Sequence, residues 1–330
     1  MTMDMERSQG TGHGALTTVM RELAVGIGVS VGMFVVLVLI PISGIAATMI
    51  VPVPSLIGVY RWGIPLGYLV PGGSALVGGT LSLLLKAPQA FVYFLELLLL
   101  GTFLGHGMRK GWSMTRTVAD AVIKVCAFGA FMFWWTHGQA EGGLWEHLET
   151  QLRTLMLSVW TETAPEGLEG SDLPVEWNVW VTVLARLFPG VAVATTIICA
   201  WLILSVTRRI LYLRGVPMPP WPAWFVWSAP EPLVWAVIAA GFLMLAPPWN
   251  AKVVGANVVI AVGAVYFLQG VAITAYYFSR WKVPSFLQAF GYALIFFQQF
   301  VGLAVAFMGF FDTWFDFRRL KKKADVLSPS

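Results

Sequence analysis

The stretch VVGANVVIAVGAVYFLQGVAITAYYF, residues 253–278, contains no Asp, Glu, Lys or Arg. A helix needs about 20 predominantly apolar residues to cross a hydrocarbon layer of about 30 Å. In lipid, the backbone amides of such a segment must be satisfied within the helix itself. The stretch therefore predicts a transmembrane helix.

The composition of the whole chain agrees with this prediction. Its 330 residues are 58% hydrophobic and 12% charged, whereas a soluble domain carries roughly 25% charged residues. A chain of this size cannot hide so much apolar surface in its own core. Soluble globular, disordered, coiled-coil and nucleic-acid-binding classes are therefore excluded, and we expect an all-α polytopic membrane protein.

Similar apolar runs recur along the chain and give eight predicted spans. Their approximate limits are Leu23–Ile40, Ser43–Tyr60, Ile64–Leu85, Pro88–His106, Val118–Thr136, Trp180–Val206, Leu233–Ala246 and Val253–Phe278. One more apolar run covers Phe286–Phe311.

Lysine and arginine residues cluster beside alternate ends of these spans, and such cations favour the cytoplasmic side of a membrane. The clustered residues are Arg7, Arg21, Arg61, Arg109, Lys110, Arg116, Arg208, Arg209, Arg214, Arg280 and Lys282. The loop 138–179 instead carries eight acidic residues against one arginine. The pattern predicts a cytoplasmic N-terminus and an outer loop at 138–179.

The last apolar run conflicts with this orientation if it crosses only once, because the basic tail 318–323 would then lie outside. Two half-helices that meet near Gln298 and Gln299 would return the tail to the cytoplasm, since irregular backbone at depth is tolerated where protein or a cavity covers it. Alternatively, the first two spans form a bent or re-entrant unit. We expect eight full spans with both termini in the cytoplasm.

The spans form one predicted membrane domain, residues 19–317. A polar tail at 1–18 precedes it and is expected to be disordered and cytoplasmic rather than a signal peptide. A basic tail at 318–330 follows it and is also expected in the cytoplasm.

Two connecting loops have a distinct character. The acidic loop 138–179 places Leu144, Leu148, Leu152 and Leu155 at helical spacing, which predicts an amphipathic helix on the outer surface. The loop 207–232 combines six prolines with three tryptophans. It is expected to lie along the cytoplasmic interface without regular helix.

Four short motifs resemble one known family. They are VPVP at 51–54, YRWG at 60–63, YFLQG at 266–270 and the more specific MGFFDTWFDFRR at 308–319. Through them the chain is similar, over nearly its whole length, to the YybS-like family of bacterial multi-pass inner-membrane proteins, a domain of unknown function. The resemblance implies location and topology but no substrate. The first four spans also resemble the substrate-binding membrane subunits of energy-coupling-factor vitamin transporters, at the level of fold.

Five polar side chains inside the spans are the predicted lining of a ligand or ion cavity: Glu96, Arg186, Lys124, Asn257 and Gln269. An ionisable group at bilayer depth costs at least about 2.5 to 3.5 kcal/mol unless it is paired or wet. Glu96 and Arg186 have similar predicted depth and form a candidate ion pair, and Lys124 can pair with Asp120 four residues earlier. A packing role is the alternative for each of the five.

The C-terminal residues Asp312, Trp314, Asp316, Arg318 and Arg319 are predicted to form an interfacial motif. The simplest interpretation is an anchor in which the two carboxylates pair with the two arginines. A site for a lipid head group or a partner protein is the first alternative. A magnesium site for a diphosphate substrate is the second.

Three functional hypotheses follow. The first is a transport-related or small-ligand-binding protein. The second is a non-catalytic scaffold for envelope or division machinery, with a protein partner at the cytoplasmic loop or the outer helix. The third is a lipid-modifying enzyme, which is least favoured because no HExxH, GxSxG or cysteine–base pattern is present. We expect no metal, no cofactor and no nucleic-acid partner.

Overall fold

The computed structural model describes residues 2–40, 44–138, 143–163 and 175–319, and these form helices and connections without a strand. The chain divides into two compact units. The first comprises residues 1–129 and 199–221, and the second comprises residues 130–198 and 222–330. The all-α polytopic class that the sequence predicts is confirmed.

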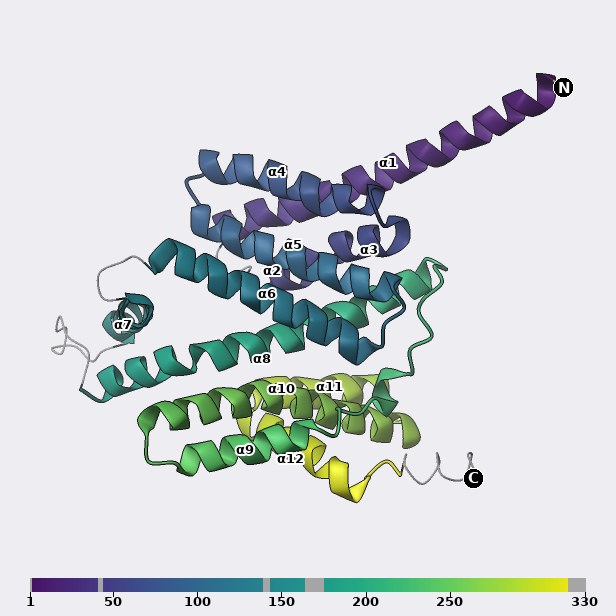
Figure 1. Cartoon of the computed structure of the whole chain (residues 1–330). Helices are drawn as coiled ribbons and strands as arrows, with labels where there is room; N and C mark the ends of the chain where they lie inside the picture. Colours follow the sequence, from purple (N-terminus) through teal and green to yellow (C-terminus); the bar gives the residue numbers. More distant parts are fainter. Residues whose placement is uncertain (1, 41–43, 139–142, 164–174, 320–330) are drawn as a thin grey trace. The chain divides into compact units, whose positions relative to one another are not determined.

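The first unit is built from six complete helical elements and parts of two long helices. These are α1 (Thr2–Leu39), α2 (Gly44–Ile50), α3 (Pro52–Trp62), the 3-10 turn η2 (Leu66–Tyr68), α4 (Leu69–Leu84), α5 (Pro88–Arg109), the first part of α6 (Met114–His137) and the last part of α8 (Val175–Leu213) (Figure 1). Helices α3 and α5 pack closely because Gly105 lacks a side chain; a Cβ there would lie 2.6 Å from the carbonyl oxygen of Leu56. Phe34, Val51 and Phe94 are fully buried in the core beside them.

Helix α1 begins at Thr2, so helix occupies positions where the sequence predicts a disordered tail. Extending an existing helix adds one hydrogen bond for each residue that is ordered and avoids the cost of nucleation. The apolar part of α1 provides that existing helix, because residues Thr17–Leu39 are long and apolar enough to cross a membrane.

The second unit contains α7 (Gly143–Thr163), the first part of α8, the 3-10 turn η3 (Trp224–Val226), α9 (Leu233–Leu245), α10 (Trp249–Arg280), α11 (Ser285–Phe297) and α12 (Gln299–Phe315). Both α9 and α12 pack along α10. The α10–α12 contact depends on Gly270 and Gly309, because a Cβ at either position would collide with backbone of the other helix. Small residues allow this approach in membrane helices generally.

Helix α7 confirms that the loop 138–179 contains a helix, and Figure 1 shows it end-on. Its location on the outer surface stays a prediction. The Pro/Trp-rich loop begins after Leu213 rather than at residue 207, because α8 extends that far. Beyond it the chain is irregular to Pro232 except for turns and η3, as the prolines predict.

Seven segments of the described chain are long and apolar enough to cross a membrane: Thr17–Leu39, Gly44–Trp62, Leu66–Leu84, Pro88–Arg109, Met114–His137, Trp177–Leu213 and Trp249–Arg280. Each overlaps a predicted span. The pair α11 and α12 qualifies as an eighth candidate if its two helices are counted as one span.

The bend between α11 and α12 confirms the predicted pair of half-helices. The two helices meet at 97°, and Gln298 between them has extended backbone with φ −100° and ψ 106°. Gln298 is therefore the single residue that connects the end of α11 to the start of α12. The sidedness of the tail that follows remains a prediction.

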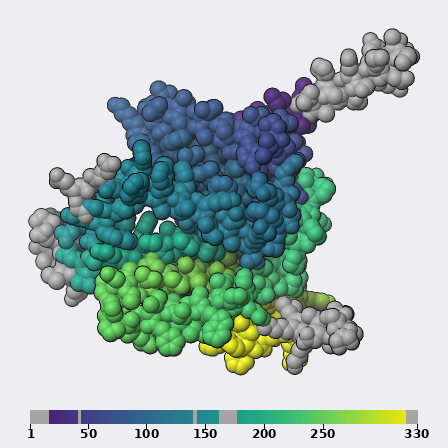
Figure 2. Space-filling view, in the orientation of Figure 1, coloured from purple at the N-terminus to yellow at the C-terminus, as the bar shows by residue number. Residues whose placement is uncertain are grey.

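Helix α9 differs from the full span predicted at Leu233–Ala246. It has 13 residues, about 20 Å at 1.5 Å per residue, which is shorter than a hydrocarbon layer. Prolines at both ends limit the length of this helix: Pro230 and Pro232 precede it, and Pro247 and Pro248 follow it. Its atoms, green in Figure 2, lie at the surface of the second unit, where Trp235 is exposed.

Candidate functional site

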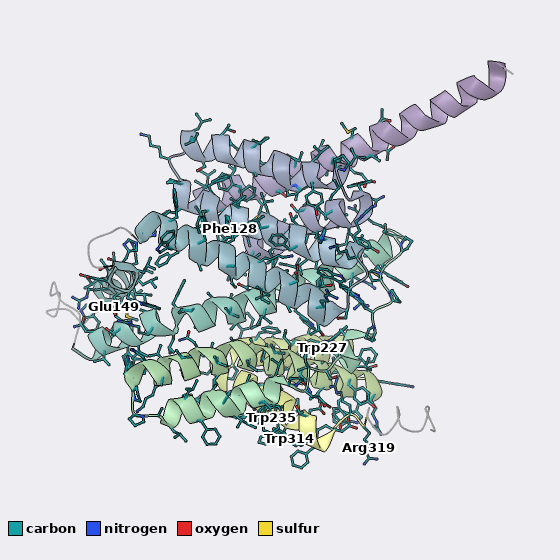
Figure 3. All side chains as sticks on the ribbon, in the orientation of Figure 1. Phe128, Glu149, Trp227, Trp235, Trp314 and Arg319 are labelled. Carbon is teal, nitrogen blue, oxygen red and sulfur yellow. The ribbon has the colours of Figure 1, made fainter. Side chains whose placement is uncertain are left out.

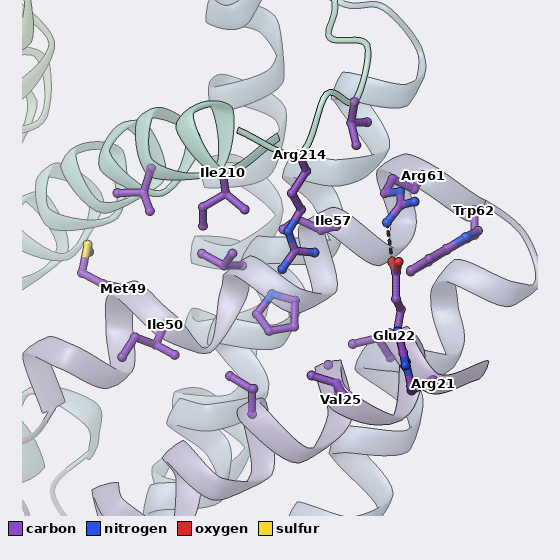
Figure 4. Close-up of a pocket in the computed structure, with 17 residues that line it drawn as sticks. Arg21, Glu22, Val25, Met49, Ile50, Ile57, Arg61, Trp62, Ile210 and Arg214 are labelled. Carbon is purple, nitrogen blue, oxygen red and sulfur yellow. Dashed lines mark hydrogen bonds and ion pairs between the residues drawn. The ribbon is translucent and has the colours of Figure 1, made fainter. Parts of the chain in front are cut away.

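A pocket of about 750 Å³ opens in the first unit between α1, α2, α3 and the end of α8 (Figure 4). Its volume falls in the range of about 300 to 1,000 Å³ typical of small-molecule sites. Most of the wall is aliphatic, with contributions from Val25, Val29, Ile57 and Ile210. The pocket therefore offers mainly an apolar surface to an occupant.

Each of three helices presents an apolar row that ends in an arginine. Residues four apart lie on one face of a helix. The rows are Arg21, Val25 and Val29 on α1; Val53, Ile57 and Arg61 on α3; and Val206, Ile210 and Arg214 at the end of α8. All nine residues line the pocket, so three cationic side chains converge on one apolar space.

One carboxylate partly balances these cations. Glu22 forms an ion pair with Arg61, and both side chains are about one-third exposed. The Arg61 guanidinium also lies 4.8 Å from the ring centre of Trp62. Within the part of the chain that the structure describes, the guanidinium groups of Arg21 and Arg214 have no ion pair. Among the described residues, two cations of the pocket therefore have no counter-charge.

Figure 4 shows how these groups lie. Glu22 and Arg61 face one another, Arg214 projects into the pocket beside them, and Met49 and Ile50 lie on the far side. The pocket thus has a polar side and an apolar side. Such an arrangement can hold a molecule that carries both an acidic group and an apolar body.

None of the five predicted cavity residues is among the 17 residues that line this pocket. Glu96 and Lys124 belong to the first unit, whereas Arg186, Asn257 and Gln269 belong to the second. Four of the five have polar partners elsewhere on the chain, described below. The structure therefore does not gather them into one cavity within either unit.

Glu96 is half-buried on α5 and, among the described residues, has no hydrogen bond or ion pair. Gly129 on α6 leaves room for its carboxylate, because a Cβ at Gly129 would lie 2.7 Å from Oε1 of Glu96. Lys124 forms the predicted pair with Asp120, with 2.7 Å between Nζ and Oδ2. That pairing is confirmed.

Arg186 and Asn257 both lie where α8 contacts other helices of the second unit. Nε of Arg186 is 3.9 Å from Oε1 of Glu149 on α7, and its guanidinium lies 4.9 Å from the ring centre of Trp145. Glu96 belongs to the first unit, so its pairing with Arg186 stays a prediction.

The side chain of Asn257 bridges one turn of α8. Its Oδ1 accepts a hydrogen bond from the backbone N–H of Gly190 at 2.5 Å, and its Nδ2 donates to the carbonyl oxygen of Arg186 at 2.9 Å. These are the two backbone groups that would pair within a helical turn, and Pro189 lies inside it. Asn257 therefore has a structural role at this turn.

Gln269, Asp312 and Arg318 form a buried network that we call the C-terminal latch. Arg318 and Gln269 are each 2% exposed and Asp312 is 5% exposed. Nη2 of Arg318 and Nε2 of Gln269 both donate to Oδ2 of Asp312, at 2.8 and 3.0 Å. The latch brings together residues that the sequence analysis assigned to two separate sites.

The latch also holds the Pro/Trp-rich loop. Nη1 of Arg318 donates to the carbonyl oxygens of Phe225 and Trp227, at 3.0 and 2.8 Å. The backbone N–H of Ala229 donates to Oε1 of Gln269 at 3.1 Å. Three elements far apart in sequence, the loop, α10 and the chain after α12, are therefore joined by one arginine–carboxylate pair.

These contacts correct part of the predicted interfacial motif. The pairing of Asp312 with Arg318 is confirmed, but both side chains are buried in packed protein rather than placed at a surface. The reason is the C-terminal turn of α12: Asp316 is left-handed with φ 43°, and the chain beyond it turns back over the latch. Tyr277 donates to the carbonyl oxygen of Phe317 at 2.9 Å in the same turn.

Trp314 and Arg319 do lie at the surface. Trp314 is 54% exposed and lines a shallow hollow with Trp235 of α9, and Figure 3 shows the two rings near one another. Arg319 is exposed at the end of the described chain. Their location at a membrane interface stays a prediction.

No group of three or more His, Cys, Asp or Glu side chains positioned for a metal occurs among the described residues. The rings of His137 and His147 have their centres 3.9 Å apart and their planes tilted by 31°. Both oxygens of Asp312 already accept hydrogen bonds from the chain. This occupancy gives no support to the magnesium alternative for the C-terminal motif.

The pocket was missed in the sequence because its three arginines were interpreted only as orientation anchors. The signal that could have indicated it is the spacing of four between each arginine and the aliphatic residues of its row. The same spacing also occurs on any lipid-facing helix, so only the convergence of three rows distinguishes a pocket.

Comparison with known proteins identifies one family. The family described as "Predicted membrane protein (DUF2232)" matches residues 28–313. No curated protein and no solved structure matches the chain.

Proposed function

The chain belongs to the DUF2232 family of predicted membrane proteins, and we propose that within the bacterial inner membrane it is a transport-related, ligand-binding protein. The family and the apolar helices make it an integral membrane protein in contact with lipid. The positions of lysine and arginine support an orientation with both termini in the cytoplasm.

The pocket of the first unit is the observation that carries the proposal. It combines about 750 Å³ of space with an aliphatic wall and two arginines, Arg21 and Arg214, that lack a counter-charge within the described chain. Both arginines are exposed near the ends of membrane-crossing segments, Thr17–Leu39 and Trp177–Leu213, and clustered cations at such positions attract anionic groups. A ligand with an acidic group would supply the missing charge.

Native mass spectrometry of the gently extracted protein tests this proposal. We expect a retained small molecule in the wild-type protein and its loss in Val29→Trp, because Val29 lines the pocket and an indole would fill it. Val36→Trp is the matched control, since Val36 lies on the same helix, is similarly exposed and does not line the pocket. A wild-type protein without a bound molecule, or equal retention by both variants, would contradict the proposal.

The scaffold hypothesis retains one supporting observation, the exposed apolar face of α7. Leu155 and Val159 on that helix are 62% and 51% exposed. If a protein partner binds there, the same spectra should show a stoichiometric complex that Leu155→Lys removes. A complex unaffected by Leu155→Lys would exclude α7 as the contact.

A further inference from the structure

We propose that the pocket of the first unit binds a net-anionic phospholipid, with its phosphate between Arg21, Arg61 and Arg214 and its acyl part along the three aliphatic rows. The inference rests on the proposed function and specifies the ligand class of the same site. It follows from the charge, the shape and the accessibility of the pocket.

The charge of the pocket selects a net-anionic head group. Its ionisable lining consists of three arginines and one carboxylate, Glu22, which is paired with Arg61. A head group with its own ammonium would bring a cation towards Arg21 and Arg214, and such like-charge contacts disfavour the wrong ligand. A phosphate without that ammonium meets only attraction, and the planar guanidinium group matches phosphate oxygens in bidentate geometry.

The shape of the pocket selects an amphiphile. Along α1, the distance from Arg21 to Val29 is eight residues, about 12 Å at 1.5 Å per residue. The cation lies at one end of this row and the remaining positions are valine. A wholly polar solute would satisfy the arginines but would place polar groups against the aliphatic wall, whereas an acyl chain matches that wall.

The pocket is accessible from the side of the helices. Val25, Val29 and Val206 line it and are 60%, 44% and 46% exposed, although they lie in membrane-crossing segments. Exposed aliphatic side chains in such segments face lipid rather than water. A phospholipid can therefore enter along the bilayer without leaving it.

The experiment compares lipids that differ only in the head group. Purified full-length protein in detergent is titrated with phosphatidylglycerol or phosphatidylethanolamine of identical acyl chains, and bound lipid is counted by native mass spectrometry. A third arm uses glycerol 3-phosphate, which carries the phosphate without acyl chains. Each arm is run on the wild-type protein, on Arg21→Gln/Arg214→Gln, and on the charge-matched control Lys110→Gln/Arg209→Gln, whose residues are exposed in the same unit and outside the pocket.

We expect the wild-type protein to bind one phosphatidylglycerol at least about tenfold more tightly than phosphatidylethanolamine, because the ammonium of phosphatidylethanolamine would lie close to Arg21 and Arg214 and like-charge contacts weaken binding. The double pocket variant should lose this preference and the control variant should keep it. Equal loss in the control would show nonspecific attraction to surface cations and overturn the inference.

Three other outcomes distinguish a failure of this inference from a failure of the proposed function. Arginine-dependent binding of glycerol 3-phosphate, with no lipid preference, would overturn the lipid assignment and leave ligand binding intact. A second copy of the chain that competes with lipid for the pocket would overturn the lipid assignment too. No bound molecule in any arm, together with no retained ligand after extraction, would overturn both proposals.

Discussion

Removal of Arg318 should destabilise the second unit far more than removal of its neighbour Arg319. In the Arg318→Met variant, Asp312 keeps a buried charge with its cation gone, and the carbonyl oxygens of Phe225 and Trp227 lose their donor. Breaking a buried ion pair by deleting one partner costs about 3 to 5 kcal/mol. We expect a loss of this size in the free energy of unfolding, measured by denaturation in mixed micelles with tryptophan fluorescence.

Two further variants show whether the loss in the free energy of unfolding comes from the ion pair between Asp312 and Arg318. Arg319→Met should change the free energy of unfolding by less than about 0.5 kcal/mol, as is usual for an exposed side chain. The double variant Asp312→Leu/Arg318→Met should lose no more than the worse single variant, because neither charge is then left alone. Additive losses in the double variant, or a loss below about 1 kcal/mol in Arg318→Met, would refute the reasoning.

Three more outcomes are expected. Asn257→Ala should lower the free energy of unfolding by about 1 to 3 kcal/mol, because it removes the side chain that pairs with the Gly190 N–H and the carbonyl oxygen of Arg186; a loss below about 0.5 kcal/mol would argue against the bridge. Glu149→Gln should lower the free energy of unfolding by less than about 1 kcal/mol in the same assay, because the 3.9 Å ion pair of Glu149 with Arg186 is about one-third exposed. A larger loss would mean that this ion pair is the main contact that holds α7. Arg319→Cys, in a chain whose native cysteines are replaced by serine, should react only with a maleimide that reaches the cytoplasm, and labelling from outside would refute the cytoplasmic tail.

The polar residues inside the spans illustrate how far sequence reasoning reaches. The free energy needed to place a polar side chain in lipid indicates that Lys124, Asn257 and Gln269 need polar partners. Each of them has such a partner in the structure. The nearest partner along the chain could be predicted, as Lys124 and Asp120 show. Partners on distant segments could not, because a hydropathy pattern contains no information on which helices become neighbours.

The sequence by itself determined the class of the protein and most of its spans, and it indicated a bend near Gln298 and Gln299 as one of two alternatives. These depend on local quantities: the transfer of apolar side chains into lipid, the length of a helix and the sidedness of lysine and arginine. Only the tertiary structure decided that Arg318 is buried in the latch while Arg319 stays exposed, and that Arg21, Arg61 and Arg214 meet in one pocket. The physical reason is that burial and charge balance are properties of several packed helices together, so each arginine acquires its role from residues that lie far away in the chain.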